Sequence, residues 1–178
     1  MSFRPLTSCD FITRLPICPS TGLPVYQEFS GEQVSDLEVF LETPDFTQLK
    51  QLPPWQRAYG VAEHLGQSGT ATAFGLLLSS MWYEPENFIS NDSILDQFLA
   101  EADGELERAS DADKPFLEAI VGYALMASDR VEKAEVRLNR ASEAADAPDF
   151  LLQYISSIRA CQRNMDIVGR RPHDRFDP

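Results

Sequence analysis

Cysteine and histidine are scarce in this sequence, and their positions exclude the common disulfide and metal patterns. The three cysteines, Cys9, Cys18 and Cys161, include no CxxC pair, which suits a reducing compartment better than a disulfide framework. We expect Cys9 and Cys18 to be buried apolar thiols and Cys161 to lie on the apolar stripe of a helix. The two histidines, His64 and His173, have no further ligand at metal spacing on a shared helix face. We therefore expect no metal and no cofactor.

Long apolar runs and a leader segment are also missing. The densest apolar stretch, Ala71 to Met81, is shorter than the roughly 18 residues that cross a bilayer and contains polar residues. The first residues, Met1 to Pro5, lack the apolar segment of a signal peptide. We therefore expect a cytoplasmic protein with no membrane-spanning helix.

Motifs of catalysis and phosphate binding are absent as well. The chain contains no GxGxxG, no Walker loop, no HExxH and no GxSxG motif. These absences favour a non-catalytic protein.

Positive charge is scarce. The chain has 15 lysines and arginines against 28 aspartates and glutamates, a net charge of −13. Residues 84–113 hold ten acidic residues and one basic residue, and residues 32–56 hold five acidic residues and one basic residue. Such a surface repels nucleic acids and anionic membranes, and it favours a protein partner with a basic surface.

The apolar pattern predicts an all-α protein built from antiparallel helical hairpins. Residues 1–29 contain four prolines and no helical period, so we expect an irregular arm that packs on the helices. Residues 30–169 form the predicted single helical domain, and residues 170–178 form a polar tail.

Apolar residues recur at steps of three and four from Ser30 onward, which predicts seven helices. Capping boxes are expected at Ser30 with Gln33 and at Ser93 with Asp96, and Gly66 is expected to follow the end of a helix. The predicted helices cover roughly residues 30–43, 53–65, 70–82, 93–109, 114–127, 130–145 and 148–168.

Small and large apolar residues follow a fixed spacing in the hairpin predicted at residues 114–145. Gly122 is followed by Ala134 after twelve residues, Leu138 after four more and Ala141 after three more. This spacing resembles the tetratricopeptide repeat. The resemblance implies stacked helical hairpins. We expect Gly122 and Ala134 to lie where the two helices touch, with Leu138 beside them. The alternative is an unrelated helical bundle.

An acidic stripe is predicted on the helix at residues 93–109. Its members, Asp92, Asp96, Asp103 and Glu107, are separated by four, seven and four residues, which places them on one helix face. We interpret the stripe as the docking surface for a basic partner. A merely solvated face and a divalent-cation site are the alternatives.

Two aromatic residues, Trp82 and Tyr83, end a predicted helix shortly before Pro85. They are expected either to pack between hairpins or to anchor the partner beside the acidic stripe, because Trp and Tyr contribute strongly to interfaces.

Together these features predict a non-catalytic protein–protein interaction module, an adaptor or a chaperone-like protein, with an acidic docking surface for a basic partner. One alternative is an acidic inhibitor of the immunity type that blocks a basic active site. Another is an enzyme whose site assembles only in the folded chain. The groove between stacked hairpins is the competing binding surface.

Overall fold

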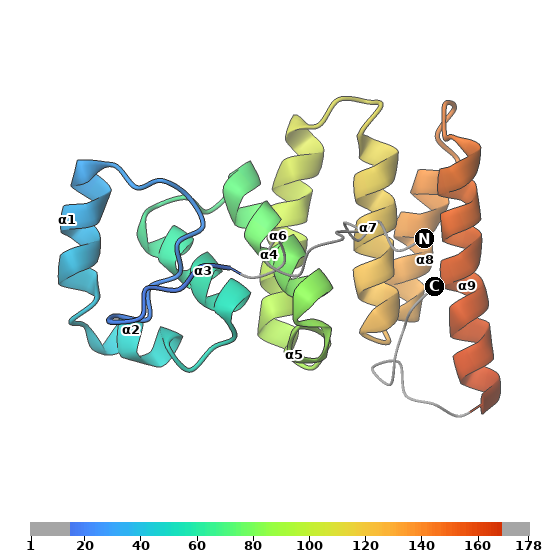
Figure 1. Cartoon of the computed structure of the whole chain (residues 1–178). Coiled ribbons are helices and arrows are strands. Elements are labelled where there is room, and N and C mark those ends of the chain that lie inside the picture. The colour runs from blue at the N-terminus through green and yellow to red at the C-terminus, as the bar shows by residue number, and fades with distance from the viewer. Residues whose placement is uncertain (1–14, 169–178) are drawn as a thin grey trace. The chain divides into compact units, whose positions relative to one another are not determined.

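The computed structural model describes residues 15–168, whose backbone forms nine helices and no strand (Figure 1). The predicted all-α class is confirmed. Contacts group these residues into two compact units, residues 15–87 and residues 88–168. None of the described helices is long and apolar enough to span a bilayer. The helices are α1 (Gly31–Phe40), α2 (Pro44–Leu49), α3 (Pro54–His64), α4 (Ala71–Tyr83), α5 (Pro85–Ile89), α6 (Asp92–Arg108), α7 (Lys114–Ala127), α8 (Val131–Ser142) and α9 (Asp149–Val168).

Local sequence signals set the ends of the first helices. The Ser30 Oγ accepts from the Gln33 N–H at 3.2 Å, and the Gln33 Oε1 accepts from the Ser30 N–H at 3.0 Å. The predicted capping box of α1 is therefore confirmed. Gly66 follows α3 with a φ of 69°, a left-handed conformation that glycine adopts without strain.

The start of α6 differs from the prediction. Asn91 is the capping residue, and its Oδ1 accepts from the N–H groups of Ser93 and Ile94 at 3.1 and 3.3 Å. The capping box predicted at Ser93 and Asp96 is wrong, because the helix begins earlier and Asn91 satisfies two of its open N–H groups. Asp96 instead forms an ion pair with Arg130.

The sequence pattern predicts seven helices, and the structure adds two short ones, α2 and α5. They begin at Pro44 and Pro85, where proline is tolerated because the first helical position needs no N–H donor. Thr43 caps α2 by accepting from the Phe46 N–H at 3.2 Å. With six and five residues, these helices are too short to show a helical period.

In residues 15–87, α3 and α4 pack as a hairpin, and the segment before α1 lies against the helices. Arg57 of α3 donates to the carbonyls of Gly22 and Lys50 at 3.0 and 2.8 Å. The apolar side chains of the segment that pack against the cluster of Leu37, Phe40, Phe46 and Val61 are Leu23, Tyr26 and Phe29. The predicted division into arm, single domain and tail stays a prediction, and residues 1–14 and 169–178 lie outside the described part of the chain.

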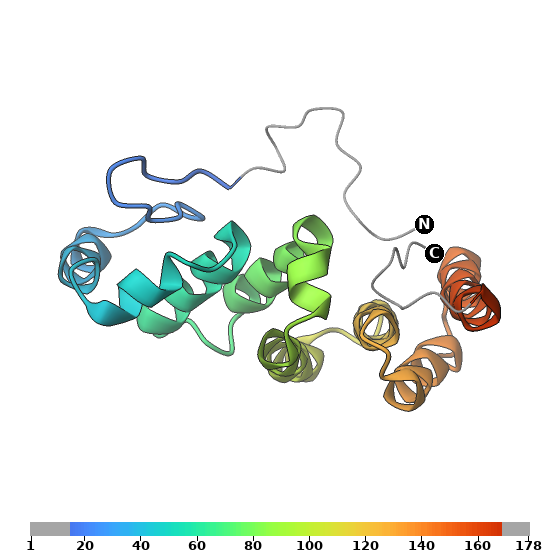
Figure 2. The same cartoon turned by 90° about the horizontal axis from the view of Figure 1, so that it is seen from below.

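In residues 88–168, α7 and α8 form a hairpin that packs against α9, and α6 packs against α7 (Figures 1 and 2). Gly122 and Leu138 meet between α7 and α8, where a Cβ on Gly122 would lie 2.5 Å from the Leu138 Cδ2. Ala134 and Leu138 are fully buried. The predicted close approach of these two helices is confirmed.

Candidate interaction surfaces

The acidic stripe on α6 meets an arginine that follows α7. The Arg130 guanidinium donates to the Asp92 Oδ1 at 2.7 Å and to the Asp96 Oδ1 at 3.1 Å. Asp92 and Asp96 lie 38 and 34 residues before Arg130 in the sequence. Pairing residues three or four apart along one helix therefore does not predict these ion pairs. Both aspartates keep most of their side-chain surface in water, at 87% and 66% exposure.

Arg137 of α8 joins three helices. It donates to the Asp103 Oδ1 of α6 at 2.5 Å and to the Glu118 Oε2 of α7 at 3.1 Å. The side chains of Arg137 and Glu118 are only 18% and 13% exposed. Removing one partner of such a shielded ion pair is costly, because the other charged group then stays buried without a partner.

Three of the four predicted stripe residues are therefore engaged by arginines of the chain itself. The fourth, Glu107, is exposed and has no ion pair among the described residues. The docking role of the stripe stays a prediction. Part of its charge serves to hold α6 against the α7–α8 hairpin.

Trp82 and Tyr83 lie in the unit of residues 15–87, whereas the stripe lies in the unit of residues 88–168. Tyr83 stacks on Trp55 of α3, with ring centroids 5.7 Å apart and an interplanar angle of 27°. Trp82 is partly exposed. Tyr83 thus has a packing role, and the anchor role of the two aromatics stays a prediction.

Unpaired acidic side chains gather on α1 and directly after it. Glu32, Glu38 and Glu42 are exposed, and none forms an ion pair within residues 15–168. Val39, between them, is 71% exposed. We call Glu32, Glu38, Val39 and Glu42 the α1 acidic face. Residues 26–49 contain six acidic residues and no lysine or arginine.

The inner side of α1 is fixed by packing. Leu37 and Phe40 are buried, and the Phe40 ring stacks on His64 with centroids 3.7 Å apart. The His64 Nε2 lies 3.1 Å from the Asp36 Oδ2, so Asp36 is the acidic residue of α1 that has a partner. These contacts orient the α1 acidic face toward solvent.

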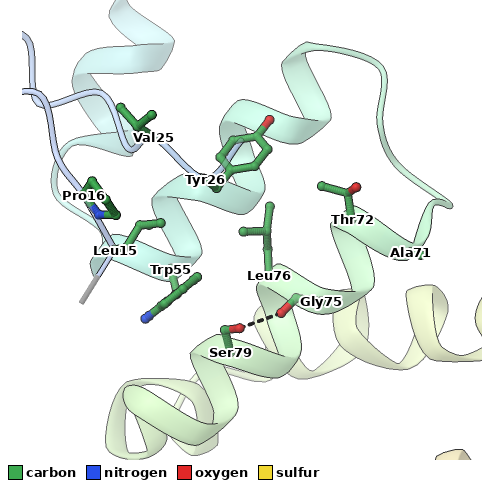
Figure 3. A pocket seen from close by; sticks show the side chains of 10 residues that line it. All are labelled: Leu15, Pro16, Val25, Tyr26, Trp55, Ala71, Thr72, Gly75, Leu76 and Ser79. Atoms are coloured by element: carbon green, nitrogen blue, oxygen red, sulfur yellow. Dashed lines mark hydrogen bonds between the residues drawn. The ribbon is translucent and has the colours of Figure 1, made fainter. Parts of the chain in front are cut away.

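A hollow of about 380 Å³ lies between the segment before α1 and helices α3 and α4 (Figure 3). Tyr26, Trp55 and Leu76 form much of its wall. The Tyr26 hydroxyl donates to the Gln67 Oε1 at 2.9 Å. Burial raises the pKa of Tyr26 to about 12, so this hydroxyl is a neutral donor at physiological pH. The sequence gives no signal for the hollow, because three separate segments build it.

The wall residue Trp55 is held in place from α4. Its backbone N–H donates to the Glu84 Oε1 at 3.0 Å, and the Ser80 Oγ lies 3.3 Å from the Glu84 Oε2. Glu84 therefore satisfies an open N–H at the start of α3, where Pro53 offers no side-chain cap. Burial raises the pKa of the Glu84 carboxyl.

The cysteines differ from the expectation. Cys18 is partly exposed and lies in a turn, with its Sγ 3.3 Å from the Ser20 Oγ. The buried thiol predicted there is wrong, because Pro19 and Gly22 turn the chain at the surface. Cys9 lies outside the described residues, and Cys161 is half-buried.

Within residues 15–168, no group of three or more His, Cys, Asp or Glu side chains is arranged to hold a metal ion. No protein-family model, no curated protein and no solved structure matches the chain.

Proposed function

We propose that the chain is a non-catalytic protein–protein interaction module, of the adaptor or chaperone type, that presents an acidic docking surface to a basic partner. The observation that carries the proposal is the unequal pairing of its acidic side chains. Three of the four α6 stripe residues pair with arginines of the chain, whereas Glu32, Glu38 and Glu42 on the α1 acidic face have no ion-pair partner within residues 15–168.

The unpaired carboxylates are well placed to attract a basic protein. Glu38 and Glu42 are four residues apart, so they repel each other by roughly a few tenths of a kcal/mol. A partner's lysines and arginines would relieve that repulsion and speed association. The exposed Val39 adds apolar surface that the carboxylates surround.

The α6 stripe is the weaker docking surface. A basic partner there would compete with Arg130 and Arg137, which already hold Asp92, Asp96 and Asp103. Glu107 is the stripe residue that a partner would reach without this competition. The α1 acidic face, and not the stripe, is therefore the primary docking site.

We also infer that the α7–α8 hairpin is built like a tetratricopeptide repeat. The contact of Gly122 with Leu138 supports this inference. So does the full burial of Ala134 and Ala141. The α7–α8 hairpin would then be one repeat unit that packs against α6 and α9. Stacked hairpins of this kind form binding surfaces, which agrees with an adaptor role.

Titration of the ¹⁵N-labelled chain with a lysine-rich peptide at low ionic strength tests the site. We expect the amide signals of residues 31–42 to shift first. The double substitution Glu38→Lys and Glu42→Lys should weaken binding several-fold and leave the fold intact. The double substitution Glu143→Lys and Asp146→Lys is the matched control, because it changes the net charge equally at exposed residues outside both acidic surfaces.

Shifts that centre on α6, or binding that the double substitution leaves unchanged, would contradict the assignment of the site. Higher salt should weaken the interaction, because the Debye length falls to about 8 Å at physiological ionic strength.

A further inference from the structure

The hollow beside Trp55 has the dimensions of a ligand pocket and shares no residue with the α1 acidic face. Its volume is about 380 Å³, and ligand pockets measure about 300–1,000 Å³. Figure 3 shows Trp55 and Leu76 on one side and Leu15, Pro16 and Tyr26 on the other. Apolar side chains and the aromatic rings of Tyr26 and Trp55 form about half of the lining surface, and polar groups, including Thr72 and Ser79, form the rest.

One hydrogen-bond donor in the lining of the hollow, the indole N–H of Trp55, is not used within the described residues. The Tyr26 hydroxyl donates to Gln67, and the Ser79 Oγ donates to the Gly75 carbonyl at 2.8 Å, so these two hydroxyls are engaged within the chain, and Thr72 adds a third hydroxyl to the lining. The indole N–H of Trp55 has no acceptor among the described residues. A ligand that offers a carbonyl oxygen next to an apolar group would satisfy this donor.

The chain's own segment shows which chemistry this surface accepts. Two Leu-Pro pairs, Leu15–Pro16 and Leu23–Pro24, run past each other in extended form, with the Val25 N–H bonded to the Pro16 carbonyl at 2.8 Å. Pro24 is buried, and Leu15 and Pro16 line the hollow beside Trp55. One extended Leu-Pro pair, Leu15–Pro16, therefore already forms part of the wall that also holds Tyr26 and Trp55.

We propose that the hollow binds an extended, proline-containing segment of a partner protein, with lysine or arginine on its flanks. Proline-rich segments are preformed as extended helices and dock in grooves lined by aromatic rings, where donors meet their free carbonyls. The basic flanks follow from the charge of this unit, because residues 15–87 contain nine acidic residues and two basic residues. This recognition is distinct from the proposed function, since it depends on proline and not on charge alone.

The test uses the full ¹⁵N-labelled chain and a synthetic peptide with two Leu-Pro pairs between terminal arginines. A second peptide has alanine in place of each proline. We expect the proline peptide to shift the indole N–H signal of Trp55 in a saturable way and to leave that of Trp82 in place. The alanine peptide, with the same charge, should bind at least tenfold more weakly.

Filling the hollow provides the matched variant. A Cβ on Gly75, which lines the hollow, would meet nothing within 4 Å, so Gly75→Leu begins its side chain in open space. We expect this variant to weaken binding of the proline peptide at least tenfold with an unchanged circular dichroism spectrum. Gly104→Leu, in α6, is the control and should bind as the unsubstituted chain does.

A second variant, Trp55→Phe, keeps an apolar wall and removes the indole donor, and it should weaken binding several-fold. Equal affinity for the two peptides, or full binding by a folded Gly75→Leu or Trp55→Phe chain, would overturn the proposal. Binding that depends on charge alone would overturn it as well and would leave the α1 acidic face as the docking site.

Discussion

Gly122 is the residue at which the α7–α8 contact is most sensitive to substitution. In Gly122→Ala the new Cβ would lie 2.5 Å from the Leu138 Cδ2 and 2.7 Å from its Cγ. We expect a loss of about 1–3 kcal/mol in the free energy of unfolding, because a packed core does not absorb an added methyl group. Urea denaturation followed by circular dichroism measures it.

Gly104→Ala is the control for this substitution. The nearest atom to a Cβ there is the flexible Arg108 Nη1 at 3.5 Å, which is ordinary contact. Alanine should therefore stabilise α6 by roughly 0.5–1 kcal/mol. If both substitutions change stability alike, Gly122 is not at a close contact.

Cys18 is predicted to be an unusually acidic thiol. Hydrogen bonds from the side chains of Ser20 and Thr21, and then from their backbone, lower the pKa of Cys18 from the ordinary thiol value to about 6. The thiolate, which is the reactive form, is therefore present above about pH 6. The rate of alkylation by iodoacetamide, measured on the Cys18 peptide by mass spectrometry, should rise through pH 6 and level off above it.

Ser20→Ala should move this midpoint upward, because the first of these hydrogen bonds is lost. A midpoint near the ordinary thiol value of about 8.5 in the unsubstituted chain would show that the turn does not stabilise the thiolate.

At the scale of helices, Arg137 is predicted to be the main polar link between α6, α7 and α8. Arg137→Met removes two ion pairs and leaves Glu118, 13% exposed, with Arg140 at 3.6 Å. We expect a loss of about 1–3 kcal/mol in unfolding free energy. Arg137→Lys should restore only part of it, because one ammonium group does not reproduce the guanidinium fork.

Lys114→Met is the comparison for an exposed pair. Its partner Asp111 is 98% exposed, so the loss of stability should be much smaller than in Arg137→Met, because water already screens this pair. If Arg137→Met and Lys114→Met lower the stability equally in thermal or urea denaturation, the burial of the Arg137 ion pairs does not increase their contribution to stability.

The long helices and their caps are predictable from sequence because they depend on neighbours a few residues away. The capping box of α1 and the glycine after α3 are examples. Helices α2 and α5 are too short to show a helical period of apolar residues. At the start of α6, Asn91 is the capping residue in place of the capping box that Ser93 and Asp96 suggest. The approach of Gly122 to Leu138 is predictable because hairpin packing selects small residues at a fixed spacing.

The candidate sites are less predictable, because both depend on residues far apart in sequence. A regular spacing of acidic residues identifies the α6 stripe, yet Arg130 and Arg137 pair with it from 34 or more residues away. The sequence indicates the α1 acidic face only through an excess of acidic over basic residues, which does not tell which carboxylates lack a partner. The hollow beside Trp55 combines three segments, none of which carries a motif.

For the whole molecule, the net charge of −13 matters less than which carboxylates remain unpaired. Fixed internal pairs on α6 contribute to holding helices together. Unpaired carboxylates around an exposed valine on α1 offer a surface that a basic protein can neutralise. We propose that this face of α1 contacts a basic partner in the cell.

Photo-crosslinking in the native host tests that claim most directly. A photoreactive amino acid replaces Val39, which is 71% exposed on α1, and in a parallel chain it replaces Val136, which is 51% exposed on α8. We predict a specific crosslink from position 39 to a protein with a lysine- or arginine-rich contact surface, lost when Glu38→Lys and Glu42→Lys are added. No crosslink at position 39, or one that persists unchanged through the double substitution, would contradict the account.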